Sequence, residues 1–174
     1  MALVYLSIGS NIDRYRHVTS ALDALAERFS TLTLSSVYES ESVGFNGSPF
    51  FNLVVALDTE LTVGELSYWL KALEDENGRI RGGAKFAPRT LDVDILSYND
   101  VVGVIDGVEL PRGEVLYNAF VLWPLSEIAP DDRHPISQQR YESLWADYDR
   151  SKQKLWPIDF TWNGQLISHA EMFS

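Results

Sequence analysis

The chain has 174 residues and a formal net charge of −11, and its length predicts one domain with a core of its own. The acidic charge argues against general nucleic-acid binding and against attraction to an anionic membrane surface. Cysteine is absent, which excludes disulfides, zinc–thiolate sites and thiol nucleophiles.

The N-terminal part of the chain predicts a strand, a helix and a second strand. Residues 2–8 are apolar and β-prone, and Ser10 or Asn11 is expected to cap the following helix. His17 has no metal-ligand partner nearby in sequence, and we interpret it as a helix-surface histidine. Alternation over residues 31–38 predicts the second strand. The buried stripe expected on the helix comprises Val18, Ala21, Leu22, Leu25 and Phe29.

The next part predicts a loop, a third strand and a second helix. Residues 39–48 form a polar loop of the kind that often carries function. Asn52 is a lone amide in the apolar strand predicted over residues 50–57, and a buried amide needs hydrogen-bond partners. Either the fold or a ligand would supply them, and the sequence leaves both alternatives open. Thr62 and Glu65 form a capping box that opens the helix, which is expected to end near Gly78.

The most informative stretch is the strand predicted around Asp92 and Asp94. Apolar residues alternate with polar ones here, which places the two carboxylates on one face, roughly 6–7 Å apart. Such carboxylates repel each other, and a Mg²⁺ ion between them would remove that repulsion. We expect a central strand whose aspartates face the main cleft. The alternative is a half-exposed strand with a solvated acidic face.

A basic segment precedes this strand. It combines adjacent glycines with Arg79, Arg81, Lys85 and Arg89. Arginines pair with phosphates in bidentate fashion, so we expect a poorly ordered loop that closes over bound polyphosphate. The alternative is a solvated loop whose charges balance the acidic surface.

The C-terminal part predicts smaller elements. Residues 101–108 are expected to form a hairpin partner, residues 111–118 a loop, and residues 120–125 part of the core. A short helix is predicted over residues 138–148, and Asn163-Gly164 predicts a β-hairpin turn.

This order of elements predicts an α+β protein. Strand, helix, strand, strand, helix, strand is the ferredoxin-like βαββαβ arrangement, an antiparallel sheet with helices packed on it. We expect a single domain over residues 1–174, with a core of about 2–129 and an extension of about 138–174 that ends in the hairpin. The fold alone defines no chemistry.

Five sequence blocks, in order over about residues 2–129, carry a family resemblance. They are residues 6–11, 51–52, 78–81, 88–96 and 120–125. Together they resemble the 6-hydroxymethyl-7,8-dihydropterin pyrophosphokinase family of folate biosynthesis, and the Pro-Arg-Thr-Leu-Asp-x-Asp block is the most specific of the five.

The resemblance implies transfer of the terminal pyrophosphoryl unit of ATP to the pterin hydroxymethyl oxygen, which yields AMP. Asp92 and Asp94 would hold two Mg²⁺ ions and, with Arg79 and Arg89, form the catalytic group. The residues implied on the ATP side are Glu74, Arg79, Arg81, Arg89 and Ile95. Those implied on the pterin side are Ser40, Val43, Phe50, Asn52 and Phe120. Phosphoryl transfer needs mainly positioning and charge stabilisation.

The implied partners are the two small molecules, pterin and ATP. The N-terminal residues lack a signal-peptide pattern and no apolar run approaches the ~20 residues of a membrane helix, so we expect a cytoplasmic protein without a membrane partner. The sequence does not fix the oligomeric state, although a monomer is favoured.

The sequence departs from the family pattern at several positions. Arg112 and Gly113 stand where the family has histidine and an aromatic residue, and Asn118 stands where it has a later arginine. Phe86 replaces a frequent tryptophan, and Glu41 replaces a loop proline. These changes motivate one alternative, a pterin- or nucleotide-binding paralogue with weak, absent or altered activity. A nucleotidyltransferase is disfavoured by the distance between its two motifs, and an RNA-binding module by the acidic charge.

Overall fold

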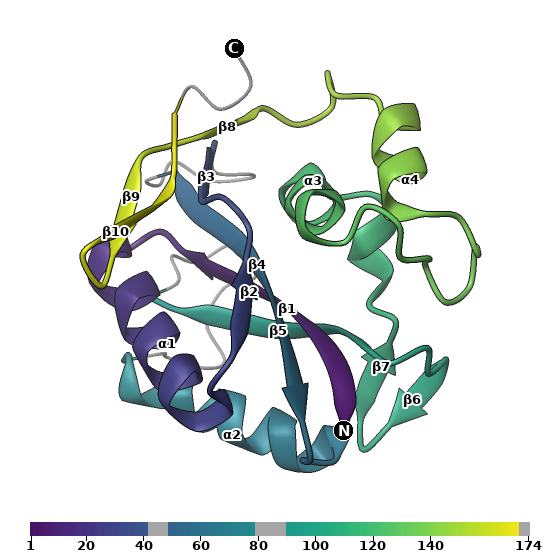
Figure 1. The fold of residues 1–174 in the computed structure, drawn as a ribbon, viewed down its shortest axis with the longest axis horizontal. Helices are drawn as coiled ribbons and strands as arrows, with labels where there is room; N and C mark the ends of the chain where they lie inside the picture. Colours follow the sequence, from purple (N-terminus) through teal and green to yellow (C-terminus); the bar gives the residue numbers. More distant parts are fainter. Residues whose placement is uncertain (42–48, 79–89, 171–174) are drawn as a thin grey trace.

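The computed structural model describes residues 1–41, 49–78 and 90–170 (Figure 1). Its main sheet has six strands in the order β5-β1-β4-β3-β8, and β2 also pairs with β4. Every pairing in this sheet is antiparallel. The strands are β1 (Ala2–Ser10), β2 (Leu32–Leu34), β3 (Tyr38–Ser40), β4 (Phe50–Thr59), β5 (Asp92–Tyr98) and β8 (Leu155–Pro157).

This topology confirms the predicted ferredoxin-like fold. If β2 and β3 are counted as one interrupted strand, the fourth strand of the motif lies beside the first, and the third lies between the first and second. The interruption occurs at Ser35 and Ser36, where Ser35 Oγ accepts the backbone N–H of Val54 and Ser36 binds the Glu127 carboxylate. The single strand predicted over residues 31–38 therefore forms as two short strands.

The prediction of a central strand around Asp92 and Asp94 was wrong. In the described part of the chain β5 pairs only with β1 and lies at the edge of the main sheet. Alternation of apolar and polar residues indicates that one face of a strand is buried and the other is open. The same pattern occurs in edge strands and in central strands, so it does not distinguish them. The element beyond β5 is a separate hairpin of β6 (Gly103–Ile105) and β7 (Val108–Leu110), which replaces the single strand expected over residues 101–108.

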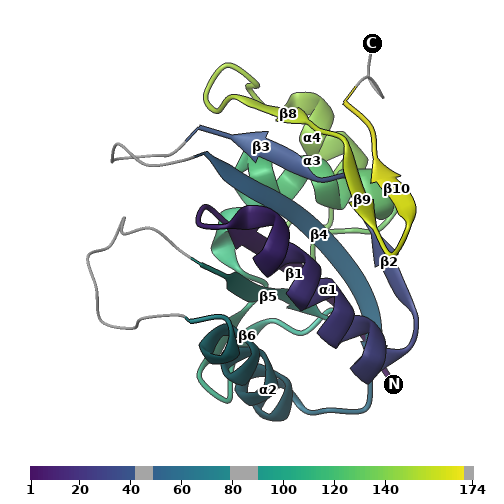
Figure 2. The ribbon, with the colours of Figure 1, turned by 90° about the vertical axis from the view of Figure 1, so that its left-hand side faces the viewer.

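Two helices cover one face of the sheet, α1 (Arg14–Phe29) and α2 (Val63–Glu76) (Figure 2). The predicted stripe on α1 is buried, and the capping box of Thr62 and Glu65 opens α2 as expected. The expected cap of α1 was wrong, because Asp13 is its N-cap residue and Ser10 Oγ donates to the backbone carbonyl of Ile12.

His17 is not a surface residue, contrary to the sequence interpretation. It is 2% exposed, and its Nδ1 lies 2.8 Å from the Asn77 side-chain oxygen at the C-terminal end of α2. This position beside the apolar stripe of α1 is buried because the C-terminal end of α2 covers it. The residue pattern of α1 alone cannot predict a contact with another helix.

The other face of the sheet carries α3 (Ala119–Ile128) and α4 (Tyr141–Asp147), preceded by a short 3-10 helix, η1 (Gly113–Leu116), within the expected loop. These helices form a second core with Tyr5, Val54 and Leu96 from the sheet. No helix in the described ranges is long and apolar enough to cross a membrane.

The C-terminal segment packs along the edge of the sheet away from β5. Strand β8 pairs with β3. The hairpin of β9 (Phe160–Trp162) and β10 (Gln165–Ser168) turns at Asn163-Gly164 as predicted. Phe160 is fully buried and stacks on Tyr15 of α1, with ring centroids 4.2 Å apart. This segment therefore packs against both the sheet and α1.

Candidate active site

Asp92 and Asp94 lie on one face of β5, as the alternation predicted. Both are half-buried, whereas Val93 between them is buried in the main core. Their face is the one that carries α3, because Leu96, two residues further along the strand, packs in the second core. The prediction of adjacent, same-face carboxylates is therefore confirmed.

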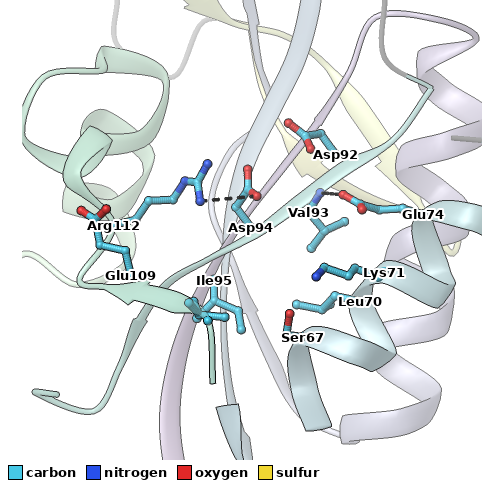
Figure 3. A pocket seen from close by; sticks show the side chains of 12 residues that line it. Ser67, Leu70, Lys71, Glu74, Asp92, Val93, Asp94, Ile95, Glu109 and Arg112 are labelled. Atoms are coloured by element: carbon cyan, nitrogen blue, oxygen red, sulfur yellow. Dashed lines mark hydrogen bonds and ion pairs between the residues drawn. The ribbon is translucent and has the colours of Figure 1, made fainter. Parts of the chain in front are cut away.

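These carboxylates line a pocket of about 360 Å³ at the open edge of β5 (Figure 3). Strand β5 forms the back of the pocket, α2 forms one wall with Lys71 and Glu74, and the segment after β7 forms the other with Arg112. Ile95 also lines the pocket, although its side chain is only 5% exposed.

The two carboxylates create a local excess of negative charge. Burial and, to a smaller extent, the neighbouring Asp92 carboxylate together raise the pKa of Asp94 to about 7. The guanidinium of Arg112 acts in the opposite direction, with Nη1 3.8 Å from Asp94 Oδ1. The pKa of Asp94 stays raised despite Arg112, so a cation bound at this carboxylate would favour its ionised form.

Glu74, the acidic residue implied on the ATP side, is 4% exposed. Its Oε2 accepts the backbone N–H of Val93 at 2.8 Å, as Figure 3 shows. Edge strands present unpaired backbone donors, and Glu74 satisfies one of them next to the carboxylate pair. It therefore ties α2 to β5 at the level of the site.

Three of the residues implied on the pterin side, Ser40, Phe50 and Asn52, lie on β3 and β4, on the other side of β1 from β5. Asn52 is 7% exposed, and its Nδ2 donates to Ser40 Oγ at 3.0 Å. This contact answers part of the question that the sequence left open, because the fold supplies one partner of the amide. Phe50 is half-buried on the same face of β4, two residues before Asn52. Phe120 is partly buried on α3 and packs against the second core.

Gly9 separates the two halves of the site. It pairs with Asn52 on one side and with Asp92 on the other, so the three residues form one row across the sheet. Directly paired residues share a face, and two strand spacings place the ends of the row about 10 Å apart. A Cβ atom at Gly9 would lie 3.0 Å from Asn52 Oδ1. The absence of a side chain therefore lets the Asn52 side-chain oxygen lie close to the backbone of β1.

Four of the implied residues, Val43, Arg79, Arg81 and Arg89, lie outside the described residues, together with Lys85 and most of the 39–48 loop. The described ranges contain no group of three or more potential metal-ligating side chains.

Sequence reasoning missed the role of Arg112. The sequence marks it only as a departure from a family pattern, yet its guanidinium lies in the pocket and contacts both Asp94 and Glu114. The Arg112-x-Glu114 pairing was visible as a local charge pair, but its approach to Asp94 depends on how the segment after β7 returns to the edge of β5.

The fold and the site together define a class of protein. A ferredoxin-like sheet that carries a carboxylate pair beside a guanidinium, next to an amide and aromatic rings, has the framework of a phosphoryl-group transferase. The family model for 7,8-dihydro-6-hydroxymethylpterin-pyrophosphokinase matches residues 5–130. The chain belongs to this family, as its motifs indicated.

Individual relatives agree with this assignment. The chain is 38% identical over 138 residues to a 2-amino-4-hydroxy-6-hydroxymethyldihydropteridine pyrophosphokinase of Aquifex aeolicus, covering 78% of this chain and 86% of that protein. It is 40% identical over 136 residues to the protein of the same name in Porphyromonas gingivalis, covering 75% and 92%.

Solved structures agree at the level of the fold. A Plasmodium falciparum HPPK-DHPS crystal structure matches with a TM-score of 0.70 and 14% identity, over 91% of this chain and 45% of that one. The chain thus spans less than half of that larger protein.

Proposed function

We propose that this protein transfers the terminal pyrophosphoryl group of ATP to the hydroxymethyl oxygen of 6-hydroxymethyl-7,8-dihydropterin, giving AMP and the pterin diphosphate for folate biosynthesis. Family membership supports the reaction. The observation that carries the assignment of the site is the row formed by Asp92, Gly9 and Asn52. It supports the assignment because the carboxylate proposed for the polyphosphate and the amide proposed for the heterocycle share one face of the sheet.

The carboxylate pair fits Mg²⁺. Hard oxygen ligands from one or two carboxylates, completed by phosphate oxygens, are what Mg²⁺ prefers, and Asp92 and Asp94 offer two such carboxylates on one face of β5. Asp92 and Asp94 would hold two Mg²⁺ ions, which when bound supply charge neutralisation on the phosphate oxygens.

The ATP side is assigned to the pocket at the edge of β5. Ile95 and Glu74 lie in its walls, and Arg79, Arg81 and Arg89 would contact the phosphates from the adjoining segment. In this arrangement the protein contributes orientation and electrostatic stabilisation, and the reaction needs no covalent nucleophile.

The pterin side is assigned to the far side of Gly9. The amide of Asn52, oriented by Ser40, would bind the donor–acceptor edge of the pterin. Phe50 and Phe120 would pack on its ring, and Val43 would lie beside it. The hydroxymethyl group would then point along the row toward the β-phosphorus of ATP.

We also propose that the protein acts as a monomer in the cytoplasm. The lack of cysteine fits a reducing compartment.

Product analysis tests the proposed function. The protein is incubated with ATP, Mg²⁺ and the hydroxymethyl dihydropterin, and AMP and the pterin diphosphate are quantified together. We expect equal amounts of both products. Tight binding of either substrate without formation of AMP would refute the assignment as an enzyme and favour the alternative of a binding paralogue.

A further inference from the structure

A chain of hydrogen bonds connects the candidate ATP site to Gln153, which lies beyond the part of the chain that matches the family model. Gln153 is half-buried, between the exposed residues Lys152 and Lys154. Its Oε1 accepts the backbone N–H of Ala119 at 2.7 Å, and its Nε2 donates to Asn118 Oδ1 at 3.0 Å. The side chain thus turns inward and meets the N-terminal end of α3.

The chain continues from Asn118 to the carboxylate pair. Asn118 Nδ2 donates to one oxygen of Glu114 at 3.0 Å, and Arg112 Nε donates to the other at 2.8 Å. The same guanidinium then presents Nη1 to Asp94 Oδ1 at 3.8 Å. Glu114 is therefore held at both oxygens, and the side chain of Arg112 is fixed between Glu114 and the site.

The direction of every bond in this network follows from its two ends. A backbone N–H can only donate and a carboxylate can only accept. Gln153 must therefore turn its oxygen to Ala119 and its nitrogen to Asn118, and Asn118 must turn its nitrogen to Glu114. Replacing a donor in the middle by an acceptor of the same shape breaks the connection without removing any packing.

We propose that Gln153 is a positioning residue for nucleotide binding, which acts through Asn118 and Glu114 to hold Arg112 at the phosphate site; the identity of the nucleotide rests on the proposed function. The side chain of Arg112 is 43% exposed, and a free arginine loses considerable rotamer entropy when it binds a ligand. The network fixes the guanidinium before the ligand arrives, which lowers this cost. The segment beyond residue 130 thereby contributes to the ATP side.

The test uses Gln153→Glu in the full chain. This change keeps an acceptor for Ala119 and removes the donor to Asn118. Gln165→Glu, at an exposed position of β10, is the control for added charge, and Gln153→Met breaks the contact without adding charge. Affinity for Mg²⁺ with α,β-methylene ATP, which cannot be cleaved at the bridge that the proposed reaction breaks, is measured by calorimetry.

We expect both Gln153 variants to bind the analogue about fivefold more weakly, and the control to bind it normally. In an Arg112→Ala background the Gln153 changes should have no further effect, because the residue acts through Arg112. The same loss in both backgrounds, no loss at all, or a loss confined to the charged variant would overturn the proposal.

A second measurement separates this proposal from the proposed function. The Nε–H signal of Arg112 is followed by NMR in the ligand-free protein. We expect it to be protected from exchange in the parent protein and the control, and to lose protection in both Gln153 variants. Unchanged protection would overturn the positioning role whatever the activity. If the Gln153 variants lose protection and analogue affinity but the parent protein forms no AMP, the pyrophosphokinase activity is refuted and the positioning role of Gln153 stands.

Discussion

The two sides of Gly9 are built differently. On the β5 side, Asp92 and Asp94 face an open pocket, and the pKa of Asp94 is raised to about 7 by burial and by the neighbouring carboxylate. On the β4 side, the buried amide of Asn52 already has a partner in Ser40. One half of the site holds two carboxylates together in a pocket, and in the other half the fold supplies one partner of the amide.

This difference matches the chemistry of the two proposed substrates. The Mg²⁺ ions that accompany a triphosphate bring positive charge, which compensates two neighbouring carboxylates and the phosphate oxygens together. A flat, uncharged heterocycle is recognised mainly through hydrogen bonds. Its binding therefore depends on protein amide groups that the fold has already oriented.

Removing the charge of Asp94 should break the β5 side most severely. We expect Asp94→Asn to lower kcat/KM by at least about 100-fold, because metal-assisted charge stabilisation is lost. Thermal unfolding should show no destabilisation, since the change relieves repulsion with Asp92. Asp100→Asn, in an exposed turn, is the matched control. Near-normal turnover of Asp94→Asn would remove this residue from the metal site.

Asn52→Ala should impair the β4 side of the site, with a smaller effect than Asp94→Asn has on the β5 side. We expect pterin binding to weaken by about 1–3 kcal/mol, because polar groups of the pterin lose a buried partner. Titration of the pterin against the intrinsic fluorescence of the protein measures this affinity. Unchanged affinity would exclude Asn52 from the pterin site.

Gly9→Ala tests the space between the two halves. The added Cβ would approach Asn52 Oδ1 to 3.0 Å and enter the row between the substrates. We expect kcat to fall about tenfold, with little change in the affinity for α,β-methylene ATP. Steady-state kinetics and analogue titration measure the two effects. If kcat is retained, the substrates do not meet across Gly9.

Ser40→Ala should have the smallest effect, because the amide of Asn52 stays in place and loses only one partner. We expect pterin affinity to fall by about 1 kcal/mol, with normal nucleotide binding. The same pterin titration measures it. A loss as large as that of Asn52→Ala would mean that Ser40 binds the pterin directly.

Sequence patterns reported the local parts of this site. The two-residue period placed Asp92 and Asp94 on one face, because that period is a property of the strand itself. It could not place β5 at the edge of the sheet, since the period reports which face of a strand is buried and not whether strands pair on both of its sides.

The remaining parts depend on contacts between distant segments. The row through Gly9 needs the registers of β1 with both β4 and β5. The bond from Gln153 to Asn118 spans 35 residues. The apolar run at residues 120–125 was read as core but not as a helix, because a short apolar run containing proline does not distinguish helix from strand.

The most direct test of the central claim is to locate the metal. Mn²⁺ with α,β-methylene ATP replaces Mg²⁺, and paramagnetic broadening of backbone amide signals is measured along β1. A cation held by Asp92 and Asp94 should broaden the amide signals from Ser7 to Gly9 most strongly, because these residues pair with the segment from Asp94 to Asp92. The effect should decline toward Leu3, roughly 20 Å away along the strand. Broadening that is uniform along β1, or strongest near Leu3, would contradict a metal site beside Gly9.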